Sequence, residues 1–320
     1  MNETTAWFAE QTAKVRAEVG RAVVGQSDAV ELMLTAIIAR GHGLLEGVPG
    51  VGKTLLVKAL GAALGLLSTR IQFTPDMMPS DITGTNVFHS HKGAFETVKG
   101  PVFTELLLAD EINRTPPKTQ AALLEAMQER SVTLDGTRHA LSPFFTVFAT
   151  QNPVEFEGTY PLPEAQRDRF LLWIEIGYPS EAQEDEILRR VHRGDDLMGA
   201  VVDGIRPCFD RAGLEAARVL AGSVRAEEPL LAYLRKIVRE TRRHDAVLLG
   251  AGPRAGIALL LAAKARAALA GRDFITPDDV KELSLPVLRH RIVLKAESEI
   301  EGVVPAEVLR DVFARVEVPR

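Results

Sequence analysis

The fold is decided by the stretch Gly47-Val48-Pro49-Gly50-Val51-Gly52-Lys53-Thr54, which matches the pattern G-x-x-x-x-G-K-[ST] at every fixed position. The short apolar run Leu44-Leu45-Glu46 precedes it, and a helical pattern follows it as far as Leu64. Glycines let backbone N–H groups turn inward around phosphates, and the helix N-terminus adds favourable partial charge. The stretch therefore predicts a P-loop that binds a nucleoside triphosphate, with Lys53 at the outer phosphates and Thr54 holding Mg²⁺.

A second apolar run, Leu106-Leu107-Leu108-Ala109, ends in the carboxylates of Asp110 and Glu111. Open α/β sheets bind ligands at the carboxyl ends of their strands, so both carboxylates are expected beside the P-loop. Asp110 is suited to hold the Mg²⁺ hydration shell. Glu111 is then free to orient and polarise the attacking water, since phosphoryl transfer depends mostly on positioning and charge stabilisation. The two stretches together predict an Mg-dependent ATPase, which converts ATP and water to ADP and phosphate.

Short apolar runs alternate with helical patterns in the first part of the chain, which predicts a parallel sheet covered by helices on both faces. The expected strands are residues 44–46, 70–73, 105–109, 144–149 and 170–176. Two further stretches break this alternation and are expected to be β-hairpin insertions: residues 86–102, and residues 131–141 around the turn Asp135-Gly136. The predicted fold class is α/β, a P-loop core with a parallel five-stranded sheet and β-hairpin insertions.

Helical patterns alone follow Tyr178-Pro179. The stretch Thr276-Pro277-Asp278-Asp279 has the cap residue, proline and acidic residues of a helix start. We therefore expect two domains, a nucleotide-binding α/β domain at residues 1–180 and a small all-α lid domain at residues 181–320.

The composition is that of an ordinary globular chain, with 46% hydrophobic residues, 25% charged residues and a net charge of −5. Neither half of the chain is basic, so nucleic acid is an unexpected partner. No apolar run reaches the roughly 18 residues of a membrane span, and residues 1–20 lack the pattern of a signal peptide. Cys208 is the single cysteine, which excludes an intrachain disulfide. The simplest expected location is the cytoplasm.

Further motifs continue along the chain in a pattern that resembles the AAA+ ATPases and, among them, the MoxR family. The matching runs are Val23-Val24-Gly25-Gln26, Gly47 to Thr54, Met78 to Gly84, Ala109 to Arg114, Ala149 to Pro153, Glu157 to Tyr160, Leu162 to Gln166, Asp168-Arg169-Phe170, Pro253-Arg254-Ala255 and Leu288 to Arg291. They cover nearly the whole chain, and their density is far more specific than any single motif.

The resemblance implies a nucleotide site that is wider than the P-loop. Val24 and Gly25 match the positions where the family packs the adenine. The implied nucleotide-binding residues, ATP being the expected ligand, are Val24, Gly25, Gly47, Pro49, Gly50, Val51, Gly52, Lys53, Thr54 and Leu55, and the metal is expected at Thr54 and Asp110.

Three more catalytic roles are implied beside those of Lys53 and Glu111. Asn152 matches sensor 1, where a polar side chain helps to place the water near the γ-phosphate. Arg169 matches the arginine finger that reaches into a neighbouring subunit's site, and such a finger is worth on the order of 10³–10⁵ in rate. Arg254 matches sensor 2, which would couple the helical domain to the nucleotide.

Without the resemblance, these residues have plainer interpretations. Asn152 would start a turn before a proline, Arg169 would be a surface ion-pair residue, and Arg254 would face solvent at a helix start. The chain also departs from the family pattern at two positions. Arg167 stands where an apolar residue is usual, which leaves a second candidate for the finger. Gly252 stands where a serine is common, which should cost a cap hydrogen bond but not the arginine that follows.

Gln72, at the end of the second expected strand, is a candidate to hold Glu111 inactive until a neighbour or substrate arrives. The alternative is a solvated side chain at a strand end. A choice between the two needs the positions of both residues in space.

The resemblance also implies a homo-oligomeric ring, which is usually a hexamer in the superfamily. MoxR-like proteins typically work beside partners with a von Willebrand factor A (VWA) domain, and they help metalloenzymes mature or alter protein complexes. This chain carries no such domain, so a VWA-domain partner and a protein client are expected as separate chains. The alternative is a nucleic-acid-dependent, helicase-like motor, in which Lys92, Lys99 and Arg138 of the hairpins would touch phosphates.

Overall fold

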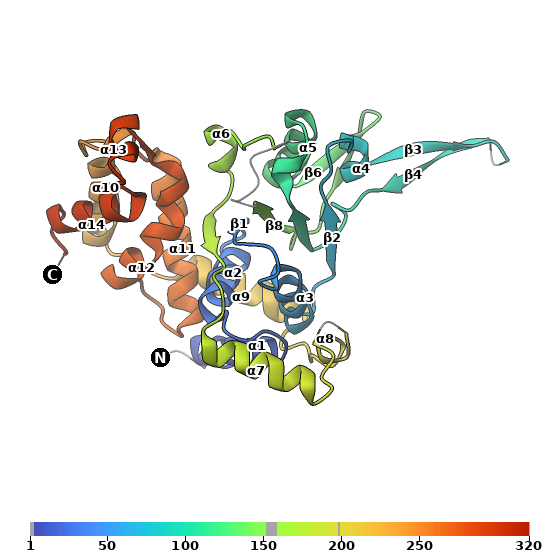
Figure 1. The fold of residues 1–320 in the computed structure, drawn as a ribbon, viewed down its shortest axis with the longest axis horizontal. Helices are drawn as coiled ribbons and strands as arrows, with labels where there is room; N and C mark the ends of the chain where they lie inside the picture. Colours follow the sequence, from blue (N-terminus) through green and yellow to red (C-terminus); the bar gives the residue numbers. More distant parts are fainter. Residues whose placement is uncertain (1–2, 92, 152–158, 198, 320) are drawn as a thin grey trace.

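The computed structural model describes residues 3–91, 93–151, 159–197 and 199–319. Its centre is a parallel five-stranded sheet with the strand order β2-β5-β8-β1-β9 (Figure 1). The strands are β1 (Gly43–Glu46), β2 (Ser68–Gln72), β5 (Leu106–Asp110), β8 (Thr146–Gln151) and β9 (Leu172–Glu175). The predicted α/β core is confirmed, and each expected strand is present with its ends shifted by at most two residues.

The strands divide their side chains between two hydrophobic cores, because successive residues of a strand point to opposite faces of the sheet. Leu45, Phe148 and Ile174 belong to one core, whereas Leu44 and Val147 belong to the other. The first core includes residues of α1 (Glu3–Ala22), α2 (Ser27–Ile38) and α3 (Lys53–Leu64), and the second includes residues of α4 (Pro79–Thr83) and α5 (Pro117–Glu129). The sheet is therefore buried on both faces, as all-parallel sheets usually are.

Two β-hairpins leave this core: β3 (Gly84–His89) with β4 (Ala94–Lys99), and β6 (Ser131–Leu134) with β7 (Thr137–Ala140). The first projects far from the body of the molecule (Figure 1). Phe88 and Phe95 pair across it with their ring centroids 5.2 Å apart, although they are 55% and 72% exposed. Its base is tightly packed, because a Cβ atom on Gly84 or Gly100 would lie 2.2 or 2.3 Å from a backbone carbonyl oxygen.

The second hairpin turns at Asp135-Gly136, as the sequence predicts. Both residues have positive φ angles, +46° and +81°, which a two-residue turn of type I′ requires. Both predicted hairpin insertions are thus confirmed.

The chain after β9 is mainly helical. Its elements are α7 (Glu181–His192), α8 (Ala200–Asp203), α9 (Arg211–Ser223), α10 (Glu228–Thr241), β10 (Val247–Leu249), α11 (Pro253–Leu269), α12 (Pro277–Leu288), η2 (Arg289–Arg291), β11 (Val293–Leu294), α13 (Ala296–Ile300) and α14 (Pro305–Arg315). The antiparallel pair β10–β11 is an addition to the predicted helices. Strands of two or three residues are too short to show a periodicity in sequence.

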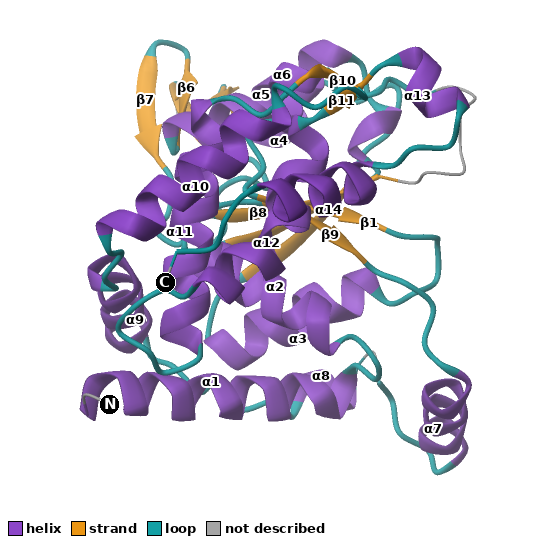
Figure 2. Ribbon diagram, turned by 90° about the vertical axis from the view of Figure 1, so that its left-hand side faces the viewer, coloured by secondary structure: helices purple, strands orange, loops and turns teal. Residues whose placement is uncertain are grey.

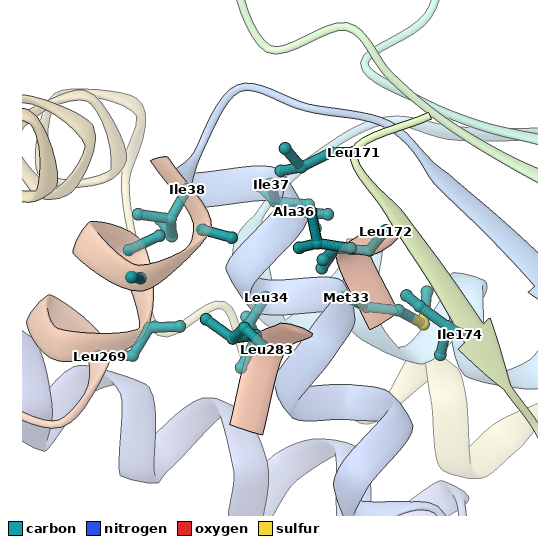
Figure 3. Packing of buried hydrophobic residues seen from close by; sticks show 14 of the residues in the cluster. Met33, Leu34, Ala36, Ile37, Ile38, Leu171, Leu172, Ile174, Leu269 and Leu283 are labelled. Atoms are coloured by element: carbon teal, nitrogen blue, oxygen red, sulfur yellow. The ribbon is translucent and has the colours of Figure 1, made fainter. Parts of the chain in front are cut away.

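The helical region and the sheet share one hydrophobic core. Helix α11 contacts α1, α2 and α9, and Figure 2 looks onto these helices with α1 beneath them. Leu34 of α2 lies beside Leu283 of α12, while Met33 points toward Ile174 of β9 (Figure 3). The division of the chain into domains at residue 180 remains a prediction.

None of the helices formed by the described residues is long and apolar enough to cross a membrane.

Candidate nucleotide site

The P-loop joins the buried strand β1 to the N-terminus of α3. Gly50 and Gly52 have φ angles of +87° and +86°, which residues with a Cβ atom rarely adopt. A Cβ atom on either glycine would meet no atom within 4 Å, whereas one on Gly47 would lie 2.4 Å from the carbonyl oxygen of Ile176. The loop thus packs against the sheet at its start and borders open space at the helix N-terminus. This cradle fits phosphate groups.

Lys53 is the first residue of α3. Its ammonium group donates a hydrogen bond to the carbonyl oxygen of Gly47 at 2.6 Å, so the side chain folds back over the loop. Burial lowers the pKa of Lys53, while the charges of Asp110 and Glu111 act to raise it. Lys53 therefore places a positive charge at the edge where the P-loop and β5 meet. Thr54, the next residue, is half-buried at the same helix start.

Asp110 ends β5 and is buried. Its Oδ1 accepts a hydrogen bond from the hydroxyl of Thr150 on β8 at 2.6 Å. Its Oδ2 accepts two hydrogen bonds from Arg70 on β2, at 3.1 and 2.7 Å. The carboxylate is thus oriented by both neighbouring strands. Carboxylate and hydroxyl oxygens are hard ligands of the kind that Mg²⁺ prefers, so the side chains of Asp110 and Thr54 fit this metal.

Glu111 follows Asp110 in the left-handed conformation, with φ 57° and ψ 50° at the start of η1 (Ile112–Arg114). Such a conformation is strained in a residue other than glycine. The carboxylate Oε2 accepts a hydrogen bond from Gln72 at 2.7 Å and forms an ion pair with Arg114 at 2.9 Å. Arg70 in turn donates to Gln72. The predicted contact between Gln72 and Glu111 is present, and it directs the carboxylate toward β2.

Val24 and Gly25 lie between α1 and α2, where they line a cavity of about 340 Å³ together with residues of α7. Gly25 has a φ of +80°, and a Cβ atom there would lie 2.4 Å from Oε1 of Gln183 in α7. The two residues expected at the adenine thus share this cavity with the first helix after β9. Asn152, the expected sensor 1, lies outside the described residues.

Arg169 lies at the other edge of the sheet. Strand β9 runs parallel to β1, with Leu172 opposite Gly43 and Glu175 opposite Glu46. The P-loop follows Glu46, whereas Arg169 precedes Leu172, and a four-residue strand alone spans about 13 Å. The structure does not bring Arg169 to the P-loop of its own chain.

Asp168 connects this edge to the helical region. Its Oδ1 accepts a hydrogen bond from Arg291 at 2.7 Å, and its Oδ2 lies 3.9 Å from Nη1 of Arg254. The Arg254 side chain is 68% exposed, and it lies at the N-terminus of α11, beside the segment that carries Arg169. The expected sensor 2 therefore lies at the same edge of the sheet as Arg169. Arg167 belongs to α6 (Glu164–Arg167), and its Nε is buried without a hydrogen-bond partner among the described residues.

Sequence reasoning did not single out Arg70, Thr150 or Gln183 for the site. Arg70 and Gln72 are two residues apart on β2, so their side chains share one face of the sheet. That spacing is a signal that could have placed Arg70 beside Gln72. Thr150 and Gln183 carry no comparable signal, because their contacts depend on which strands and helices lie side by side.

The geometry defines a P-loop ATPase, and comparison with known proteins agrees. The model of the ATPase family associated with various cellular activities (AAA) matches residues 42–172, and the model of the AAA lid domain matches residues 239–312. A crystal structure of a protein from Cytophaga hutchinsonii, assigned as an ATPase, superposes with a TM-score of 0.91 at 40% identity and covers 99% of this chain and 98% of that one. The chain is thus an AAA ATPase that hydrolyses ATP.

Comparison with three relatives narrows the class. The Bacillus subtilis protein YeaC is 44% identical over 94% of this chain and 92% of its own. Chaperone MoxR1 of Mycobacterium tuberculosis is 42% identical over 95% of this chain and 81% of its own. Protein MoxR of Methylorubrum extorquens is 35% identical over 97% and 96%. The chain belongs to the MoxR family of AAA ATPases.

Proposed function

We propose that Thr54 and Asp110 hold Mg²⁺ beside an ATP molecule whose phosphates lie in the P-loop. The open space at Gly50 and Gly52 supports this placement. Lys53 would exchange its hydrogen bond to the P-loop carbonyl for the outer phosphates. The bound metal would supply charge neutralisation at the phosphates during transfer. Val24, with the cavity around it, would take the adenine.

Glu111 would orient and polarise the attacking water, with Asn152 assisting beside the γ-phosphate. In the observed arrangement the carboxylate of Glu111 is bound by Gln72 and Arg114. We propose that this is a restrained state. Glu111 would become available when a neighbour or a client draws Gln72 away.

The proposal of a ring rests on the position of Arg169 relative to the P-loop. Arg169 and the P-loop lie at opposite edges of the same sheet, so Arg169 could serve as a finger only for another subunit's nucleotide. The guanidinium of Arg169 forms no hydrogen bond or ion pair with any described residue. Arg254 would face the same neighbour. We propose a homo-oligomeric ring, a hexamer as is usual in the superfamily, with each active site completed by the adjacent subunit.

The output would be a change of shape that remodels a protein client. The relative named Chaperone MoxR1 supports this direction. A separate VWA-domain protein is the proposed partner, and metalloenzyme maturation or the alteration of a protein complex is the proposed task. The β3–β4 hairpin, with Phe88 and Phe95 exposed, is a candidate contact. These apolar side chains do not favour the alternative of a nucleic-acid motor. A cytoplasmic location remains a prediction.

The test is ATP hydrolysis per subunit measured against protein concentration, with the size of the assembly followed by light scattering with and without ATP. Glu111→Gln should abolish turnover while ATP binding survives. Arg169→Ala should lower kcat by about 10³-fold or more, because a finger supplied in trans is worth that much. Arg310→Ala, at an exposed arginine of α14, is the control and should leave kcat unchanged. A monomer with full activity at every concentration would refute the ring.

A further inference from the structure

Arg291 is an arginine of the helical region whose side chain is only 4% exposed. All five of its N–H groups have acceptors. Nε donates to Oδ1 of Asp168 at 2.7 Å. Nη2 donates to the carbonyl oxygens of Asp168 at 3.2 Å and Phe170 at 2.7 Å. Nη1 donates to the carbonyl oxygens of Leu171 at 3.2 Å and Val287.

Four of these five bonds end on residues 168–171, the segment that contains Arg169. The carbonyl groups of Asp168 and Phe170 belong to the residues on either side of Arg169, so the backbone is held on both sides of it. His290 adds a contact between its Nε2 and the carbonyl oxygen of Phe170 at 3.0 Å. Burial lowers the pKa of His290 well below its usual range, which keeps its ring neutral in this contact. The helical region thus holds the backbone on both sides of Arg169 in place through these hydrogen bonds.

The Arg169 side chain takes no part in the hydrogen bonds that Arg291 and His290 make with residues 168–171. It is half-buried and forms no hydrogen bond or ion pair with a described residue, so its direction depends on the backbone that carries it. When a group that stabilises a transition state is displaced by about 1 Å, the rate can fall on the order of 10²-fold. A planar guanidinium with five donors in a rigid fork fixes a backbone segment in a way that a flexible ammonium does not.

We infer that Arg291 is the positioning residue for the Arg169 finger, and that it acts through residues 168–171 on the active site of the neighbouring subunit. This inference rests on the proposed function, in which Arg169 works in trans. It also gives the helical region a route to another subunit's nucleotide, since Asp168 binds Arg291 and lies beside Arg254. A movement of η2 would then shift Arg169 and change the rate of hydrolysis at the adjacent subunit's site. It would not change the P-loop of the same chain.

The variant is Arg291→Lys, which keeps the charge and loses the fork. We expect kcat of its homomeric assembly to fall by about 10- to 100-fold, with KM for ATP little changed because the P-loop is untouched. Arg272→Lys is the matched control. Arg272 forms a comparable pair with Asp279, at 2.7 and 2.5 Å, but within the helical region. Arg272→Lys should lower the melting temperature without lowering kcat.

Assemblies that contain two kinds of subunit show whether Arg291 positions the finger or only stabilises its own subunit. Arg291→Lys subunits are co-expressed with an excess of Glu111→Gln subunits under different tags, and assemblies that contain both are isolated by two affinity steps. The Glu111→Gln subunits have no turnover of their own, but their fingers are intact. Activity per Arg291→Lys subunit should rise toward the wild-type value as the share of Glu111→Gln subunits increases. A loss that stays within the Arg291→Lys subunit would overturn the inference.

Arg169→Ala mixed with Glu111→Gln in the same way tests the underlying proposal. If that pair recovers activity and the Arg291→Lys pair does not, the finger acts in trans and Arg291 does not position it. If neither pair recovers activity, the finger does not act in trans and the proposed function itself fails. If both recover, the finger and its positioning residue are assigned together.

Discussion

Removing the side chain of Gln72 is expected to raise the basal rate of ATP hydrolysis. Gln72→Ala deletes the 2.7 Å hydrogen bond to the carboxylate of Glu111. A hydrogen bond to a charged group is worth about 1.5–3 kcal/mol, and each 1.4 kcal/mol is tenfold in rate, which sets a ceiling of about 10- to 100-fold. Arg114 still holds the same oxygen at 2.9 Å. This partly exposed ion pair is worth up to about 1 kcal/mol. The difference of about 0.5–2 kcal/mol corresponds to an expected increase of about 2- to 30-fold.

The assay is steady-state phosphate release at saturating ATP, together with KM for ATP. Gln128→Ala is the matched control, because Gln128 is an exposed glutamine of α5, and its rate should equal that of the wild type. The double variant Gln72→Ala/Glu111→Gln should have no turnover, which assigns the increase to Glu111. A Gln72→Ala rate at or below the wild-type value, with ATP still bound, would refute the idea that Gln72 restrains the carboxylate.

Three further predictions concern the binding of ATP and the stability of the fold. Lys53→Met removes the cation at the P-loop, and ATP affinity should fall by about 10- to 100-fold in calorimetry because a charge-assisted contact is lost; an unchanged affinity would contradict the placement of the phosphates. Phe148→Ala empties a fully buried site on β8 and should lower the free energy of unfolding by about 3–5 kcal/mol in urea titrations, with a loss below about 1 kcal/mol as the contrary result. Burial lowers the pKa of His42 from 6.5 to about 3, so between these values only the unfolded chain binds its proton. Stability should fall as the pH falls through this range, by about 1.4 kcal/mol per pH unit from this residue, and His42→Gln should remove that part of the slope.

The edge of the sheet that carries the P-loop could be predicted from the sequence because its parts are local. A buried strand followed by Gly47 to Thr54, and another followed by Asp110 and Glu111, needs only the rule that parallel strands end at the same edge. The structure has that arrangement, with the charges of both carboxylates acting on Lys53. The turn at Asp135-Gly136 was predictable for the same reason, since two adjacent residues determine it.

Contacts between distant segments could not be predicted in this way. Gln183 of α7 lies against Gly25, more than a hundred residues away in the chain, and the pairing of Arg254 with Asp168 depends on how α11 packs against the sheet. Motif matching identified Arg254 correctly as a residue at a helix start but had no means of showing which edge of the sheet it faces. The hydrogen bonds from Arg291 to residues 168–171 likewise depend on how the helical region packs against the sheet. Side-chain partners of this kind are set by tertiary contacts rather than by spacing.

The glycine pair at the base of the β3–β4 hairpin has a consequence for how such a protein changes over generations. Gly84 and Gly100 allow two segments of the backbone to approach so closely that any side chain at either position would collide with a backbone carbonyl. Beyond that joint, every residue of β4 is exposed, and substitutions at exposed positions cost little stability. The exposed residues of this hairpin, and with them the surface that it contacts, can therefore change during evolution while the buried ATPase core stays the same.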